Sequence, residues 1–148
     1  MKKKFLLSVL VIVLLFISAF AGASVAAGGK KPSDYKIGMT YSMAVNNDKP
    51  AIVLVYADWC GYCKRFMPNF ETLYRQYSLK YNFSMVNSDT NGAITRQLGV
   101  NGYPTVFIID KKYNQKIEIP NEYYSDVNAM SARFNLYLKR RQEWANKR

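Results

Sequence analysis

The fold is decided by residues 51–63, whose sequence is AIVLVYADWCGYC. Residues 51–57 form an uninterrupted apolar run rich in β-branched side chains, which is typical of a strand buried on both faces of a sheet. The run leads into Cys60 and Cys63, and beyond Gly61 apolar side chains recur at helical spacing. This pattern predicts that the two cysteines lie where a central strand gives way to a helix. The apolar positions of that helix are Tyr62, Phe66, Phe70, Leu73 and Tyr77.

Working outward, apolar periodicity and turn residues predict six further elements. They are a short helix at 40–46, a strand at 83–87, a helix at 93–98 that ends at Gly99, a strand at 105–109, a strand at 115–119 joined to it by a hairpin loop, and a final helix at about 125–146. The final helix carries its apolar side chains on one broad face: Val127, Met130, Phe134, Tyr137, Leu138 and Trp144. This order predicts an α/β fold with a central mixed β-sheet flanked by helices on both faces.

The N-terminal residues have the layout of an export signal. Three lysines follow Met1, an apolar run extends from Phe5 to Phe20, and small residues between Ala19 and Ala27 provide several cleavage sites. We expect cleavage between Ala21 and Ala27. The alternative is an uncleaved membrane anchor, because the apolar stretch approaches the roughly 20 residues that span a bilayer. Both interpretations place the rest of the chain outside the cytoplasm, either in the periplasm or secreted.

Three segments are therefore expected. Residues 1–27 form the signal peptide or N-terminal membrane anchor, and residues 28–38 form a flexible leader rich in Gly, Lys and Pro. Residues 39–148 are long enough for one compact domain with its own core, but not for two.

The composition excludes several kinds of chemistry. The chain has no histidine and only two cysteines. Catalytic triads that use an imidazole base are therefore ruled out. A structural zinc site needs about four Cys or His ligands, so this chain cannot build one alone. We expect neither a metal nor a cofactor, and the two cysteines act together or not at all.

The formal net charge is +11, which leaves several kinds of partner open. A basic exported protein can bind an anionic membrane surface or acidic partners, although a charged, solvated surface that only maintains solubility is the simpler interpretation. Apart from Lys139-Arg140-Arg141 the sequence has no dense basic run with interleaved aromatic residues. We therefore expect no nucleic-acid binding.

The position of the cysteines points to redox chemistry. A helix N-terminus presents unpaired N–H groups and the positive end of the helix dipole, so Cys60 gains thiolate character there. Its sulfur would attack a disulfide, and Cys63, one turn away, would displace the partner and close the ring. Lys64 and Arg65 favour the thiolate, whereas Asp58 opposes it. A structural disulfide is the alternative, but so small a loop removes little entropy from the unfolded chain.

Residues near the dithiol have more than one interpretation. Trp59 is either a core residue or, as we favour from its place at a strand exit, a partly exposed platform for substrate. Tyr103 serves equally well for packing or for substrate contact. Only about 5–6% of X–Pro bonds are cis in folded proteins, so the sequence alone predicts a trans bond before Pro104.

Three motifs together resemble the thioredoxin family: Ala57-Asp58-Trp59-Cys60-Gly61-Tyr62-Cys63-Lys64, Pro68 five residues past the second cysteine, and Gly102-Tyr103-Pro104-Thr105. The resemblance implies a thioredoxin fold and a thioredoxin-like domain over 39–148. It implies that Cys60 is the nucleophile, that Cys63 resolves the mixed disulfide, and that Pro104 is a cis-proline facing the dithiol. It also implies that the Tyr103 backbone pairs with an extended substrate. The expected substrate-binding residues are Trp59, Gly61, Tyr62, Tyr103 and Pro104.

Two departures from the family limit this transfer. Cytoplasmic thioredoxins keep a buried aspartate in the strand before the dithiol and a lysine nearby, and here Leu54 and Met85 occupy those places. The usual proton acceptor for Cys63 is thus missing, and water or Asp58 would have to take the proton.

We therefore expect an extracytoplasmic thiol:disulfide oxidoreductase that acts on exported proteins and is recycled by a membrane or soluble redox partner. Whether it works as a reductase, an oxidase or an isomerase depends on its potential. Isomerases of this kind generally need a dimerising module, which the sequence does not show, so a monomeric reductase or oxidase is favoured. A non-catalytic binding module for exported proteins is the alternative.

Overall fold

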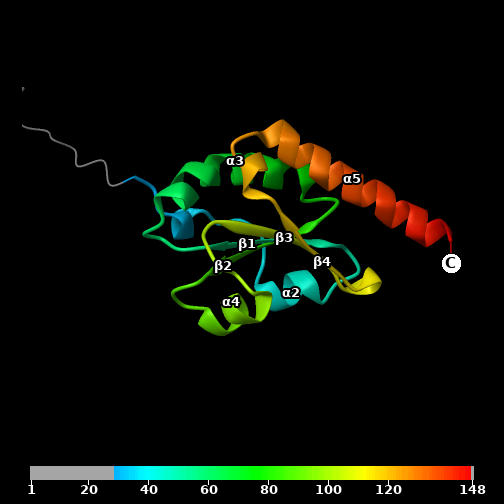
Figure 1. The fold of residues 1–148 in the computed structure, drawn as a ribbon, viewed down its shortest axis with the longest axis horizontal. Helices are drawn as coiled ribbons and strands as arrows, with labels where there is room; N and C mark the ends of the chain where they lie inside the picture. The colour runs from blue at the N-terminus through cyan, green and yellow to red at the C-terminus, as the bar shows by residue number, and fades with distance from the viewer. Residues whose placement is uncertain (1–28, 148) are drawn as a thin grey trace, which may run out of the picture.

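The computed structural model describes residues 29–147. A four-stranded sheet forms the centre of the domain, in the order β2-β1-β3-β4 (Figure 1). Strand β1 pairs parallel with β2 and antiparallel with β3, which pairs antiparallel with β4. The strands are β1 (Ala51–Tyr56), β2 (Asn82–Asn87), β3 (Thr105–Asp110) and β4 (Gln115–Ile119); the α-helices are α2 (Tyr41–Val45), α3 (Gly61–Tyr77), α4 (Gly92–Leu98) and α5 (Val127–Asn146).

Strand β1 lies at the centre of the sheet and divides the core in two. All six of its residues are buried, as the uninterrupted apolar run predicts. Ile52 and Leu54 belong to the core under α3 and α5, whereas Val53 and Val55 belong to the core on the α2 and α4 side. Helices α3 and α5 cover one face of the sheet and α2 and α4 the other (Figure 1). The predicted mixed sheet with helices on both faces is confirmed.

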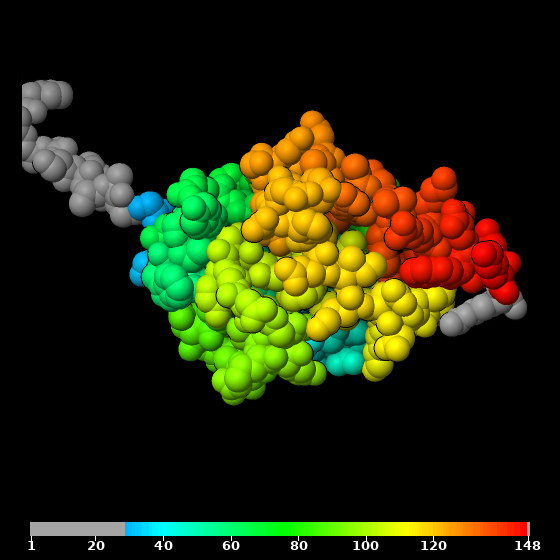
Figure 2. Space-filling model, viewed as in Figure 1, coloured from blue at the N-terminus to red at the C-terminus, as the bar shows by residue number. Residues whose placement is uncertain are grey.

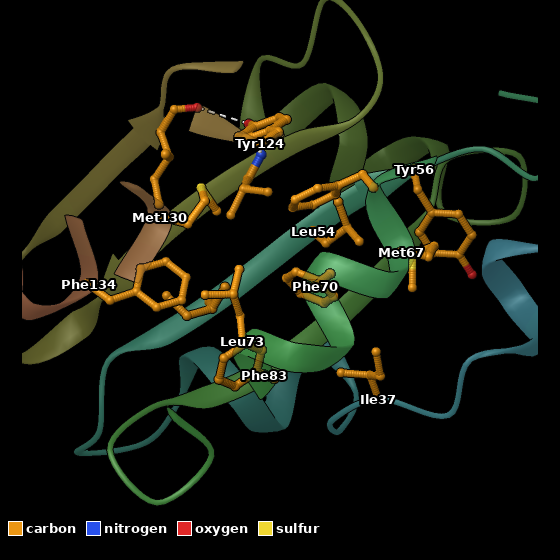
Figure 3. Close-up of a cluster of buried hydrophobic side chains, with 14 of the residues drawn as sticks. Ile37, Leu54, Tyr56, Met67, Phe70, Leu73, Phe83, Tyr124, Met130 and Phe134 are labelled. Atoms are coloured by element: carbon orange, nitrogen blue, oxygen red, sulfur yellow. Dashed lines mark hydrogen bonds between the residues drawn. The ribbon is translucent and has the colours of Figure 1, made fainter. Parts of the chain in front are cut away.

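Aromatic rings pack together with aliphatic side chains in the larger core (Figure 3). Phe83 of β2 contacts Phe70 of α3 and Phe134 of α5, with ring centroids 5.6 Å and 6.4 Å apart. Burying each Phe side chain away from water contributes about 1.5–3 kcal/mol to the stability of the fold. This packing holds α3, and with it the dithiol, against the sheet.

The predicted elements are confirmed, with ends that differ by one or two residues. Gly99 ends α4 in the left-handed conformation, with φ of 75°, as expected of a glycine after a helix. Helix α5 begins at Val127, two residues later than predicted, because the Asp126 side chain accepts a hydrogen bond from the Asn128 N–H and caps it.

The leader differs from the expectation of a flexible segment over 28–38. Pro32–Asp34 form a 3₁₀ helix (η1), and Ile37 is buried in the core under α3. Gly38 has φ of 77°, and a Cβ there would lie 2.0 Å from the carbonyl oxygen of Phe83, so the chain passes β2 closely where only glycine fits. The packed domain therefore begins before residue 39.

A buried carboxylate ties the end of β3 to α5. Asp110 is fully buried, and its Oδ2 accepts hydrogen bonds from Tyr137 Oη at 2.9 Å and Arg141 Nε at 2.7 Å. Its Oδ1 accepts from the Lys112 N–H at 3.1 Å. Tyr137 has a raised pKa, chiefly because of burial and secondly because it donates to Asp110. Both carboxylate oxygens thus accept hydrogen bonds, and these bonds with the Arg141 charge offset the cost of burying the carboxylate.

Removing Arg141, the cation that pairs with the Asp110 carboxylate, should destabilise the fold. We expect Arg141→Met to lower the free energy of unfolding by about 3 kcal/mol, because it leaves a buried charge without its cation. The control is Arg75→Met, which removes the exposed pair between Arg75 and Glu71 on α3 and should change stability by about 0.5 kcal/mol or less. Urea unfolding measures both variants, and equal losses would contradict a stabilising role for the Asp110 contact.

Candidate active site

Cys60 and Cys63 lie at the start of α3, directly after β1, and both are thiols in this structure. Cys60 is the N-cap residue, and its Sγ accepts a hydrogen bond from the Cys63 N–H at 3.1 Å. The Cys60 thiol donates to the Tyr103 carbonyl oxygen at 3.5 Å. A sulfur at an N-cap accepts from one of the N–H groups that a helix leaves unpaired. The site therefore offers a donor and positive potential to a negative charge on Cys60.

Cys63 lies beneath Cys60 in the core and is fully buried. Burial raises the pKa of its thiol to about 12, with the hydrogen bond to Cys60 as the second cause. Near neutral pH Cys63 is therefore protonated. It has to lose that proton before it can attack another sulfur.

The strand beneath the dithiol supplies no acid to accept this proton. Leu54 of β1 and Met85 of β2 are paired residues in the sheet, and Leu54 is fully buried. Both places are thus apolar. The Asp58 carboxylate accepts hydrogen bonds from the Ser33 N–H at 2.9 Å and the Asn87 amide at 3.4 Å. These contacts hold η1 and β2 against the loop that carries the dithiol.

Two exposed aromatic side chains flank the dithiol. Trp59 and Tyr62 are 69% and 71% exposed, so the interpretation of Trp59 as a core residue is wrong. The Trp59 indole N–H donates to Asp89 Oδ1 at 3.2 Å. The Trp59 and Tyr103 rings pack in a T-shaped arrangement with their centroids 6.0 Å apart. These contacts hold a large apolar surface in a defined position beside Cys60.

The Tyr103–Pro104 bond is cis, as the resemblance implies and contrary to the trans bond predicted from sequence alone. All five predicted substrate-binding residues lie around the dithiol. A hollow of about 510 Å³ over Cys60 is lined by Trp59, Gly61, Tyr62 and Tyr103, together with Asn101 and Gly102. Pro104 lies in the adjoining groove.

That groove has a volume of about 630 Å³ and combines residues from three segments. The start of α3, the residues before β3 and the residues before α5 meet there, and they are neighbours on one face of the molecule (Figure 2). Sequence reasoning missed most of its lining. Helical spacing from Tyr62 could have indicated Arg65, Phe66 and Asn69. No local signal indicates the lining residues that precede α5, which are Asn121, Tyr124 and Ser125.

Comparison with known proteins gives the family. The thioredoxin family model matches residues 35–129. The chain belongs to the thioredoxin family. It is similar to thioredoxin of Borreliella burgdorferi, with 35% identity over 89 residues that cover 60% of this chain and 74% of that protein. It is also similar to the chloroplast thioredoxin-like protein HCF164 of Arabidopsis thaliana, with 34% identity over 102 residues that cover 64% of this chain and 39% of that protein.

Protein disulfide-isomerase 1 of Dictyostelium discoideum is 33% identical over 110 residues, which cover 70% of this chain and 30% of that protein. The chain thus spans less than half the length of HCF164 and of this isomerase. Family membership together with the adjacent cysteines assigns the chain to the thiol:disulfide oxidoreductases.

Solved structures agree on the fold. The Trx4 domain of ERdj5 superposes with a TM-score of 0.59 at 23% identity, covering 69% of this chain and 94% of that chain. Mitochondrial thioredoxin 3 of Saccharomyces cerevisiae superposes with a TM-score of 0.51 at 24% identity. The match covers 62% of this chain and 80% of that chain. The thioredoxin fold is confirmed.

Burial of Cys63 predicts an unreactive thiol. In Cys60→Ser, whose one thiol is Cys63, we expect iodoacetamide to react at pH 8 about 100-fold more slowly than with the same variant unfolded in urea. Because the pKa is raised, the rate should keep increasing above pH 10. A rate that levels off near pH 9, as for an ordinary thiol, would contradict this account.

Placing an acid beneath the dithiol should help Cys63 to react. We expect Leu54→Asp combined with Met85→Lys to raise turnover near pH 7 by about 10-fold, because a carboxylate can then accept the Cys63 proton. The lysine is included because Leu54 and Met85 are paired in the sheet and an unpaired buried charge destabilises the fold. The matched control is Leu54→Asn with Met85→Gln, which places two uncharged polar side chains at the same positions. Identical pH profiles of turnover in the two folded variants would show that a missing acid does not limit the reaction.

Proposed function

We propose that this protein is an extracytoplasmic thiol:disulfide oxidoreductase that exchanges disulfides with exported proteins through Cys60 and Cys63. The observation that carries the proposal is the Cys60 sulfur at the N-cap of α3, 3.1 Å from the Cys63 N–H and next to an exposed hollow. An N–H donor and the helix dipole both favour a sulfur anion there.

In the reducing direction the Cys60 thiolate attacks one sulfur of a client disulfide. The client S–S bond breaks, and the departing client sulfur takes a proton from water. Cys63 then gives its proton to water and attacks the Cys60 sulfur, which releases the second client sulfur as a thiolate. That thiolate takes up from water the proton that Cys60 released when it ionised. The client gains two electrons and two protons, and Cys60 and Cys63 become a disulfide that a dithiol donor reduces again.

The side chains around Cys60 are assigned roles in holding the client. We propose that an extended client segment lies along Tyr103 and Pro104, while Trp59, Gly61 and Tyr62 border the sulfur. Support comes from the exposure of Trp59 and Tyr62 and from the hollow that they share with Cys60.

The export-signal pattern of residues 1–27 supports a location outside the cytoplasm, although it lies outside the described residues. Between residues 29 and 147, none of the helices has the length and apolar character needed to cross a membrane. The proposed partners are exported proteins with thiols or disulfides, and a membrane or soluble donor that recycles the dithiol. We propose that the protein acts as a monomer.

Insulin reduction in the presence of dithiothreitol tests the activity. We expect the wild-type protein to accelerate precipitation of the insulin B chain, and Cys60→Ser to lose this acceleration entirely because the attacking sulfur is gone. Incubated with insulin without dithiothreitol, Cys63→Ser should instead accumulate a mixed disulfide between Cys60 and insulin, detectable by mass spectrometry. If the wild type binds insulin without accelerating its reduction, the exposed Trp59 and Tyr62 serve a binding module and the proposed activity is wrong.

A further inference from the structure

The groove beside the dithiol has one charged side chain in its lining, and that side chain is a cation. Its other lining residues are aromatic, neutral polar or proline: Tyr62, Phe66, Asn69, Tyr103, Pro104, Asn121, Tyr124 and Ser125. The cation is Arg65, which is exposed. Within residues 29–147 the ion pairs are Arg75 with Glu71 and Arg141 with Asp110. Arg65 therefore has no carboxylate partner in the described part of the chain.

The Arg65 guanidinium is held in place over the first turn of α3. It lies 4.5 Å from the centre of the Tyr62 ring, in a cation–π contact. A Cβ on Gly61 would lie 3.7 Å from Arg65 Nη1, so the side chain folds back toward the dithiol. The contact with the ring restricts the guanidinium in part, so less freedom is lost when it binds a carboxylate, and its planar shape allows two parallel hydrogen bonds to that group.

The groove is also continuous with the hollow over Cys60, because Tyr62 and Tyr103 line both. The Arg65 guanidinium folds back to Gly61, the residue after Cys60. An extended client chain advances about 3.3 Å per residue. A client side chain within three residues of the reacting cysteine can therefore reach Arg65.

We propose that Arg65 selects client segments that carry a carboxylate within three residues of the reacting cysteine. This proposal rests on the proposed function and names the substrate class of the same site. The aromatic lining holds apolar parts of the segment, and Arg65 pairs with the acid.

Two disulfide-linked peptides test the proposal. One carries Glu two and three residues on each side of its cysteine, and the other carries Gln at the same positions. With wild-type protein at low salt we expect kcat/KM to favour the Glu peptide by about 2- to 5-fold, as for a partly exposed ion pair. Arg65→Gln should bring the ratio to 1, and Arg65→Glu should invert it.

The matched control is Lys64→Gln, which removes the same charge from the neighbouring residue, outside the lining of the groove. It should leave the peptide ratio unchanged. If Arg65→Gln slows both peptides equally, Arg65 acts on the Cys60 sulfur and the proposal is overturned. A wild-type ratio of 1 overturns it too. If neither peptide is reduced at all, the proposed function itself fails, which distinguishes the two hypotheses.

Discussion

The Cys63 N–H donates to the Cys60 sulfur across 3.1 Å, and the chemistry of this protein depends on that contact. It exists because a fully buried strand, β1, ends at Tyr56 and the chain starts a helix at Gly61. The sulfur thus takes the place of a capping oxygen. The same geometry buries Cys63 and raises the pKa of its thiol to about 12. One arrangement therefore separates a sulfur that borders the hollow, on a residue that is 5% exposed, from a protonated sulfur beneath it.

The rest of the fold maintains this arrangement. The rings of Phe70, Phe83 and Phe134 hold α3 against β2 and α5. Tyr124 stacks on Phe66 with centroids 4.8 Å apart, and its hydroxyl donates to the Ile119 carbonyl and accepts from the Val106 N–H. The segment before α5 is thereby held beside the dithiol. This is the reason that residues from the end of the chain line a groove next to residues from its middle.

Much of this was predictable from sequence, because its signals are local. The apolar run at 51–57 and the helical spacing beyond Gly61 place the dithiol correctly, and the resemblance adds the cis bond before Pro104. Contacts between distant segments were not predictable. The pair of Asp110 and Arg141 joins residues 31 apart in sequence, and the docking of Ile37 depends on a close approach at Gly38 that has no periodic pattern.

The central claim is that the start of α3 stabilises a negative charge on Cys60, and iodoacetamide kinetics on Cys63→Ser test it most directly. This variant keeps the backbone N–H of residue 63 and has Cys60 as its one thiol. The account predicts that folded Cys60 reacts at pH 6.5 about 10-fold faster than the same variant unfolded in urea. Equal or slower reaction of the folded form would contradict it.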